Sequence, residues 1–173
     1  MAQVQSFAPW VDEASRVLIL GSMPGVASLQ AQAYYAHPRN VFWPILADLL
    51  GFEAQAPYAE RLQQLRAQGV GLWDVLQSCE RPGSLDSAIR QSTRLYNDLA
   101  GLLVSYPNIQ AVFCNGTRAY QEYQRYCKLV PQCRIEQAIR LPSTSPAHAS
   151  LSFAAKKQAW QPLLSALKRG SLE

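Results

Sequence analysis

Apolar residues along this chain alternate between short continuous runs and longer runs with helical spacing. The continuous runs predict a buried strand at 16–20 and further strands at 70–76 and 109–114, and a fourth short strand is expected near 135–141. Helical spacing predicts helices at 41–50, 57–69, 94–106, from 117 onward and at 153–168. Strands that alternate with helices favour right-handed β–α–β units. The predicted fold is therefore an α/β three-layer sandwich, with a central four-stranded, mainly parallel sheet flanked by helices.

Residues suited to the ends of helices support these boundaries. Gly51 is a natural C-cap for the helix at 41–50, and Thr117 is expected to be the N-cap of the helix after the third strand. Residues 22–40 are predicted to form one long loop of polar and aromatic residues, and 78–87 a turn-rich segment.

In a parallel sheet of this kind, a binding site lies outside the carboxyl ends of the strands. Three segments follow such ends: the loop after Leu20, the segment after the strand at 70–76, and the Pro-Ser-rich turn after Leu141. Topology alone therefore predicts that a functional site is built from these three segments.

Composition excludes several classes of protein. The chain has 173 residues, so residues 1–173 are predicted to form a single domain. Apolar residues make up 49%, which excludes intrinsic disorder, and no apolar run approaches the ~20 residues that span a bilayer. The N-terminus lacks the pattern of a secretory signal, so we expect a cytoplasmic protein with no membrane partner. The final Leu172-Glu173 resembles a vector-derived end.

Charge and cysteine spacing narrow the possible ligands. A net charge of +4 permits an anionic partner without requiring one. Arg118 and the basic residues that follow it up to Arg140 are expected to form an ordinary solvated face. The 4 cysteines include no C-x-x-C pair and there are 2 histidines, so no metal site is expected and the cysteines are predicted to be reduced and packed.

The loop after Leu20 begins with a tight turn, Gly21-Ser22-Met23-Pro24-Gly25. Glycine allows unusual φ values and proline restricts φ, so the turn is rigid. It lacks the spacing of a phosphate-binding loop and of a dinucleotide-binding fingerprint. By itself the turn is also compatible with a purely structural role.

An unusual cluster of side chains follows at 33–44, where aromatic residues stand beside a histidine, an arginine and an asparagine. Stacking surfaces next to hydrogen-bonding groups suit a pocket for a flat heterocycle. Each residue also has a structural explanation. Asn40 precedes an apolar helix and is suited to be its N-cap, and Tyr35 and the other aromatics fit a hydrophobic core.

The run from 21 to 43 resembles the first motif of the uracil-DNA glycosylase superfamily, especially its mismatch-specific uracil/thymine branch. The matching positions are Gly21, Pro24 and Gly25, then Tyr35-Ala36-His37-Pro38, Asn40, Phe42 and Trp43. The stretch at 141–148, Leu-Pro-Ser-Thr-Ser-Pro-Ala-His, stands where that superfamily carries its second motif, a Pro-Ser turn that enters the minor groove. The resemblance covers nearly the whole chain, and the long first motif is the specific part of it.

Two positions depart from the uracil-specific members of that superfamily. Those members position the attacking water with Asp or Asn where this chain has Met23, and stabilise the departing base with His or Asn where it has Leu141. A thioether and an alkyl group do neither. The combination resembles the hypoxanthine-DNA (deoxyinosine) glycosylase branch, in which the asparagine of the His-Pro-x-Asn string matters for catalysis. The matching residue is Asn40.

The resemblance implies a monofunctional DNA repair glycosylase that flips a deaminated base, hypoxanthine above all, out of double-stranded DNA. Asn40 would be catalytic, the 21–25 turn would line the base pocket and the base would stack on Tyr35. Asp74 stands where the superfamily reads the base, although a turn or cap role fits it equally well. DNA contacts are expected from Ser143, Thr144, Ser145, His148 and Lys156.

The resemblance implies no cofactor, and the first motif contains no lysine for a Schiff-base lyase step. A monomer is expected. Two alternatives stay open: a glycosylase of the same fold for uracil, xanthine or a G:U/T mismatch, and a catalytically weak module that binds DNA lesions. Ser145 stands where this branch has an apolar wedge, which leaves open what fills the gap after base flipping.

Overall fold

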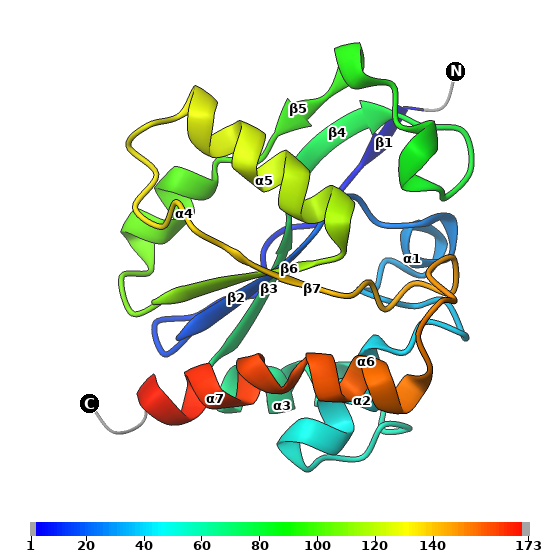
Figure 1. Cartoon of the computed structure of the whole chain (residues 1–173), viewed down its shortest axis with the longest axis vertical. Helices are drawn as coiled ribbons and strands as arrows, with labels where there is room; N and C mark the ends of the chain where they lie inside the picture. Colours follow the sequence, from blue (N-terminus) through cyan, green and yellow to red (C-terminus); the bar gives the residue numbers. More distant parts are fainter. Residues whose placement is uncertain (1–2, 171–173) are drawn as a thin grey trace.

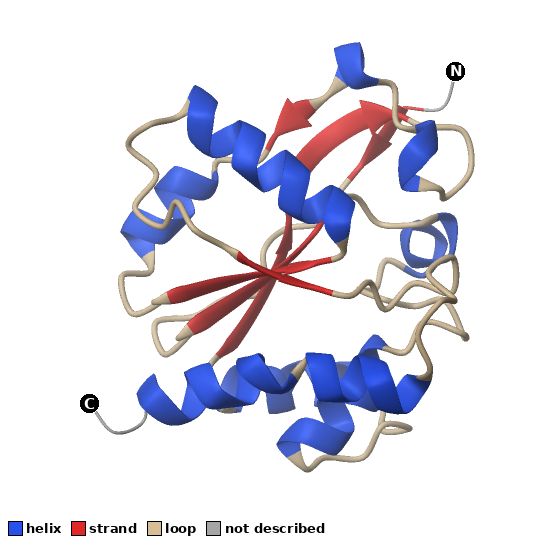
Figure 2. Cartoon of the chain, in the orientation of Figure 1, coloured by secondary structure: helices blue, strands red, loops and turns tan. Residues whose placement is uncertain are grey.

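Four parallel strands form the centre of the molecule, and helices cover both faces of the sheet (Figure 1, Figure 2). The computed structural model describes residues 3–170. The strand order is β3-β2-β6-β7. The bounds are β2 Val17–Gly21, β3 Val70–Asp74, β6 Ala111–Asn115 and β7 Ile139–Leu141. The predicted three-layer α/β fold with a central four-stranded sheet is confirmed.

The central strand β2 divides its side chains between two hydrophobic cores. Val17 and Ile19 face one core, while Leu18 and Leu20 face the other. The first core lies under α2 (Phe42–Leu50), α3 (Tyr58–Ala67), α6 (Phe153–Ala159) and α7 (Gln161–Gly170). The second lies under α4 (Leu99–Ser105) and α5 (Thr117–Leu129). Side chains of β2, β3 and β6 are buried on both faces of the sheet, which explains why these three strands are apolar runs in the sequence.

A second sheet of three antiparallel strands lies beside the first, and the sequence pattern does not predict it. Its order is β1 (Gln3–Gln5), β4 (Leu76–Glu80) and β5 (Leu95–Tyr96). The run predicted as one strand at 70–76 ends at Asp74. Val75 donates its N–H to the Gly21 carbonyl at 2.8 Å, and the chain then enters β4. The apolar run continues through this change of sheet because both strands are buried.

Two predicted helices have different bounds in the structure. The helix predicted at 94–106 begins only at Leu99, because the Asp98 carboxylate caps it by accepting the Gly101 N–H at 3.0 Å. The helix predicted at 153–168 is divided at Trp160 into α6 and α7. Pro162 explains the break, since it has no N–H and its ring clashes with the preceding turn.

Smaller corrections concern the loop at 22–40 and the start of α5. A short helix, α1 (Val26–Ala31), lies inside the predicted loop. Gly116, with φ of 98°, is the N-cap of α5, and Thr117 is its first helical residue. The predicted cap at Gly51 is confirmed by its φ of 79° and by its N–H bond to the Ala47 carbonyl.

Within residues 3–170, no helix is long and apolar enough to cross a membrane. Leu172-Glu173, which resembles a vector-derived end, lies outside the described residues.

Candidate active site

A cavity of about 670 Å³ lies at the carboxyl ends of the parallel strands and is bordered by all three segments that topology singles out. Its volume is in the usual range for small-molecule sites. The predicted residues that line it are Gly21, Ser22, Met23, Pro24, Gly25, Tyr35, Asn40, Asp74, Ser143, Ser145 and His148. Thr144 and Lys156 are not in the lining.

The turn after β2 begins with a close approach between two strand ends. A Cβ added at Gly21 would lie 2.5 Å from Asp74 Oδ1, so a larger residue would collide with the end of β3. Here the absence of a side chain lets Asp74 stand directly beside the turn.

Arg81 holds this turn in place by hydrogen bonds to backbone carbonyls. Arg81 was not identified from the sequence as a site residue. It follows β4 and is only 1% exposed. Its Nη2 donates to the Pro24 carbonyl at 2.6 Å and its Nε to the Gly83 carbonyl at 2.9 Å. A planar guanidinium donates in a fixed fork, so one side chain ties the turn to the 82–88 loop.

The two apolar departures from the uracil-specific pattern belong to the core. Met23 packs in a small cluster with Leu76, Cys79 and Ile89, although it also reaches the cavity wall. Leu141 is buried in the main core. Neither side chain has a group that could hold water or meet a developing negative charge.

Asn40 combines a capping contact with a place in the cavity wall. Its Oδ1 accepts the Phe42 N–H at 2.9 Å, which satisfies a backbone donor at the start of α2. The N-cap of α2 is nevertheless Val41, so the expectation that Asn40 is the N-cap is wrong by one residue, and Asn40 satisfies this donor from the position before the cap. An amide oxygen has two lone pairs, so this contact leaves Oδ1 able to accept a second hydrogen bond. No described residue accepts a hydrogen bond from Asn40 Nδ2.

Tyr35 has a strained backbone and a stacked ring. Its φ is 56°, in the left-handed region that bulky residues rarely adopt. Its ring stacks on Phe42 with centroids 3.9 Å apart and planes inclined by 21°. Since Phe42 covers one face, a base from the cavity would stack on the other. The Tyr35 hydroxyl is buried beside the Asn115 side chain, and no described residue makes a hydrogen bond of normal geometry with it.

Asp74 ends β3 at the cavity and is 3% exposed. Its Oδ2 is buried, and no described residue bonds to it. Burial raises the pKa of Asp74 to about 7, the nearby Asp86 carboxylate acts in the same direction, and Arg81 opposes the rise. A buried carboxyl without a partner at a cavity is suited to bind a ligand.

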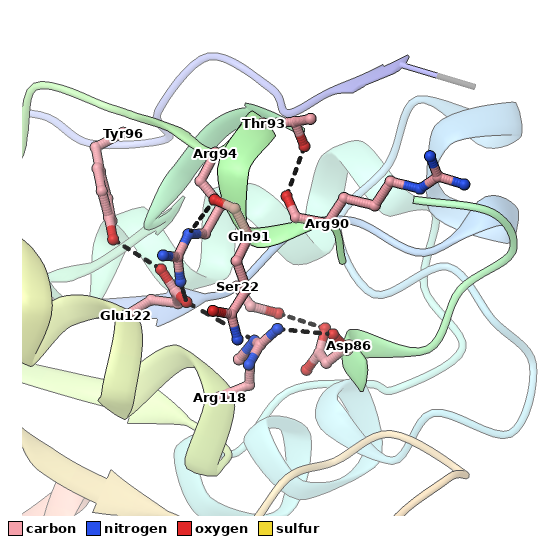
Figure 3. Close-up of polar contacts among 9 residues, drawn as sticks. All are labelled: Ser22, Asp86, Arg90, Gln91, Thr93, Arg94, Tyr96, Arg118 and Glu122. Atoms are coloured by element: carbon pink, nitrogen blue, oxygen red, sulfur yellow. Dashed lines mark hydrogen bonds and ion pairs between the residues drawn. The ribbon is translucent and has the colours of Figure 1, made fainter. Parts of the chain in front are cut away.

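Asp86, a second missed residue, joins the cavity to a polar network under α5 (Figure 3). Ser22 Oγ donates to Asp86 Oδ1 at 2.7 Å, and Arg118 Nη2 donates to the Asp86 carbonyl at 3.1 Å. The buried Glu122 carboxylate accepts from Arg94 at 2.6 Å and from Tyr96 at 2.9 Å. Glu122 is thus a buried pairing residue and Arg118 a half-buried one, whereas the other basic residues of the expected solvated face are exposed, namely Arg125, Lys128, Arg134 and Arg140.

The Pro-Ser loop after β7 is tied to the first motif. Thr144 is 1% exposed and exchanges two hydrogen bonds with Asn115, through its N–H and its hydroxyl. Its carbonyl accepts the Val41 N–H at 3.0 Å. Thr144, expected to contact DNA, is therefore turned inward and ties the two motifs together.

Lys156 also differs from the expectation. Its side chain is buried in α6 and its ammonium donates to the His148 carbonyl at 2.5 Å. Burial lowers its pKa. This lysine holds the loop at 148, whereas Lys157 is partly exposed and pairs with Asp48.

The missed residues lie in the turn-rich segment at 78–87 and at the end of β6. Topology marked the first segment as a candidate, but nothing in its pattern distinguished Arg81 or Asp86 from ordinary turn residues. Asn115 directly follows the strand predicted at 109–114, which is the one signal that could have identified it. Among residues 3–170, no cluster of three or more His, Cys, Asp or Glu is placed to hold a metal ion.

The rigid turn after β2 and the Pro-Ser loop after β7 face one cavity. This is the arrangement that the resemblance leads us to expect of a DNA glycosylase. The family model of the Uracil DNA glycosylase superfamily matches residues 8–164. The chain belongs to this superfamily.

Individual relatives agree with that assignment. The chain is 33% identical over 157 residues to a protein of Methanosarcina barkeri named hypoxanthine DNA glycosylase, covering 90% of this chain and 94% of that protein. It is 34% identical over 149 residues to one of the same name from Methanosarcina acetivorans, covering 86% and 90%. A solution NMR structure from Methanosarcina acetivorans, described as that of a "putative Uracil DNA glycosylase", superposes with a TM-score of 0.78 at 29% identity, covering 96% of this chain and 99% of that one.

Proposed function

We propose that this protein is a monofunctional DNA glycosylase that hydrolyses the N-glycosidic bond of hypoxanthine in duplex DNA. The observation that carries the proposal is Asn40, whose amide oxygen is fixed by the Phe42 N–H at the wall of a cavity. The same cavity contains Asp74, whose buried Oδ2 has no partner among the described residues. The names of the two Methanosarcina relatives support the choice of hypoxanthine. The apolar Met23 and Leu141 argue against the usual route to uracil.

In the proposed mechanism the damaged nucleotide leaves the duplex and enters the cavity, and its base stacks on the open face of Tyr35. Asn40 Oδ1 accepts a hydrogen bond from a water and holds it near C1′ of the sugar. Asp74 faces the base and accepts N1–H of hypoxanthine, a proton that adenine lacks. Cleavage through an oxocarbenium-like state depends on positioning and charge stabilisation, which a neutral amide can provide.

Contacts to the DNA backbone are proposed for the rim of the cavity. Ser143, Ser145 and His148 line its mouth, and short hydroxyl side chains position a phosphate backbone without reading sequence. Thr144 and Lys156 act indirectly by holding this loop.

The substrate is tested with duplexes that contain a single hypoxanthine, uracil, xanthine or G:T mismatch, treated with alkali and resolved on a denaturing gel. Strand breaks at hypoxanthine that disappear in Asn40→Ala are the expected result. Breaks at uracil alone would replace the proposal with a uracil glycosylase of the same fold. Retarded mobility on a native gel without any cleavage would instead indicate a lesion-binding module.

Tyr35 offers a separate test of base stacking. Tyr35→Phe keeps the ring and removes a buried hydroxyl that makes no hydrogen bond of normal geometry with a described residue, so we expect single-turnover excision within about threefold of wild type and an unchanged Tm. Tyr35→Ala removes the stacking surface and should lower the rate about tenfold to hundredfold. If Tyr35→Phe is as damaging as Tyr35→Ala, the hydroxyl and not the ring is the important group.

A further inference from the structure

A departing purine takes the electron pair of the glycosidic bond, and this chain lacks the usual group that would meet the resulting charge. Leu141, at the position of that group, is buried in the main core. Charge that develops in a transition state is best stabilised by a donor already fixed in a water-poor site. The cavity therefore needs a donor from another element.

Asp74 and Asp86 line the same cavity and repel each other, but their surroundings differ. Asp86 accepts the Ser22 hydroxyl at 2.7 Å and lies near the guanidiniums of Arg81 and Arg118, contacts that favour a carboxylate. Asp74 is more deeply buried and its Oδ2 has no partner among the described residues. When two neighbouring carboxyls carry one negative charge between them, the carboxyl with more polar partners is the one that ionises, here Asp86.

We infer that Asp74 and Asp86 work as a pair in which Asp86 carries the negative charge and Asp74 carries the proton, so that Asp74 donates a hydrogen bond to O6 of the departing base. This inference rests on the proposed function and adds a donor to it. A neutral carboxyl presents one acceptor and one donor side by side, which matches the N1–H and O6 of hypoxanthine. Uracil and xanthine carry the same lactam, so the shape of the cavity must separate them from hypoxanthine.

Asp74 donates a hydrogen bond during the hydrolysis but transfers no proton. The C1′–N9 bond breaks and its electron pair goes to the purine, while the water oxygen forms the new bond to C1′. The water releases one proton to solvent and a purine nitrogen takes one up. The Asp74 proton stays on its carboxyl, where the hydrogen bond to O6 strengthens as negative charge develops on the base.

The protonation of Asp74 depends on every charged or titratable group around it. Tyr34 and Tyr35 face it from the segment before α2, Arg81 from the end of β4, and Asp86 from the loop after it. Burial also raises the pKa of Asp86, the Glu122 carboxylate acts in the same direction, and the Ser22 hydroxyl, Arg81 and Arg118 oppose that rise. His37 and His148 line the cavity as well, so the contribution of Asp74 to the pH profile is isolated with variants of Asp74 itself.

Carbon-13 NMR titration of the aspartate carboxyls in the full chain tests the pair without any substrate. Asp74 is expected to be protonated and Asp86 ionised at about pH 6. An ionised Asp74 at that pH, or a protonated Asp86, would overturn the inference whatever the enzyme acts on.

Single-turnover excision of hypoxanthine tests the donor itself. We expect the wild-type rate to fall as pH rises through about 7, because Asp74 then loses its proton. Asp74→Asn keeps a neutral donor and acceptor, so its rate should stay within about threefold of wild type near pH 6. Because the amide does not titrate, the rate of this variant should not fall as the pH rises through about 7. Asp74→Ala should cost about 100-fold. Asp86→Asn removes the repelling charge and should move the decline to lower pH.

Asp98→Asn is the matched control, because Asp98 is an exposed N-cap outside the cavity and asparagine caps equally well. It should leave the rate, the pH profile and the Tm unchanged. If Asp74→Asn folds with the wild-type Tm yet is as inactive as Asp74→Ala, an ionised carboxylate is required and the inference fails while the proposed function stands. A wild-type enzyme that leaves hypoxanthine intact at every pH would refute the proposed function, and the NMR titration would still decide the state of the pair.

Discussion

Replacing Asn40 with alanine is expected to lower the single-turnover rate of hypoxanthine excision by about 100- to 1000-fold, equivalent to about 3–4 kcal/mol of transition-state stabilisation. The substitution removes the amide oxygen that is proposed to hold the attacking water at the cavity wall. It also removes the acceptor for the Phe42 N–H, so the free energy of unfolding should fall by about 1 kcal/mol. Quenched-flow assays on a hypoxanthine duplex and thermal unfolding by circular dichroism measure the two effects.

Asn40→Ser separates capping from catalysis. A serine hydroxyl can accept the same backbone N–H, so the Tm is expected to return to near the wild-type value. The shorter side chain does not place an oxygen where the amide carries it, so the excision rate should stay near that of Asn40→Ala. Recovery of both the Tm and the rate in Asn40→Ser would reduce Asn40 to a cap and remove the main support for the catalytic assignment.

Arg81→Ala is expected to have the largest effect on stability, a loss of about 3 kcal/mol and a fall in Tm of about 10 °C. The substitution leaves the Pro24 and Gly83 carbonyls without their buried donor and removes the cation that lies near Asp74 and Asp86. Because the 21–25 turn lines the cavity, the excision rate should fall as well. Arg81→Lys keeps the charge but not the fork, so it should recover part of the Tm and little of the rate.

Arg90→Gln is the matched control for Arg81. Arg90 follows the same loop, but its side chain is half exposed and pairs with Glu80 at 3.8 Å, a contact expected to contribute little. Its Tm and rate should stay close to wild type. An Arg81→Ala protein with the wild-type Tm and full excision activity would show that the guanidinium does not hold the turn.

Much of the fold and part of the site follow from the sequence, because they depend on local rules. Three of the parallel strands, β2, β3 and β6, are apolar runs that end in Gly21, Asp74 and Asn115, and a strand buried on both faces needs no more specific signal. The turn at 21–25 and the string around Asn40 are recognisable because the chemistry requires several residues at set spacing in one segment. These local features were enough to predict the four-stranded sheet and the family resemblance.

The tertiary structure decided what depends on contacts between distant segments. β3 ends at Asp74, which pairs with Gly21, and the chain then enters β4, so one apolar run is divided between two sheets. Lys156 and Thr144 read as free polar groups, yet burial turns both inward to hold the loop after β7. Asp86 and Arg81 acquire their roles only when the 82–88 loop lies against the 21–25 turn. Burial, charge and partners are properties of that packing, so no pattern along the chain could have indicated which of two aspartates carries a proton.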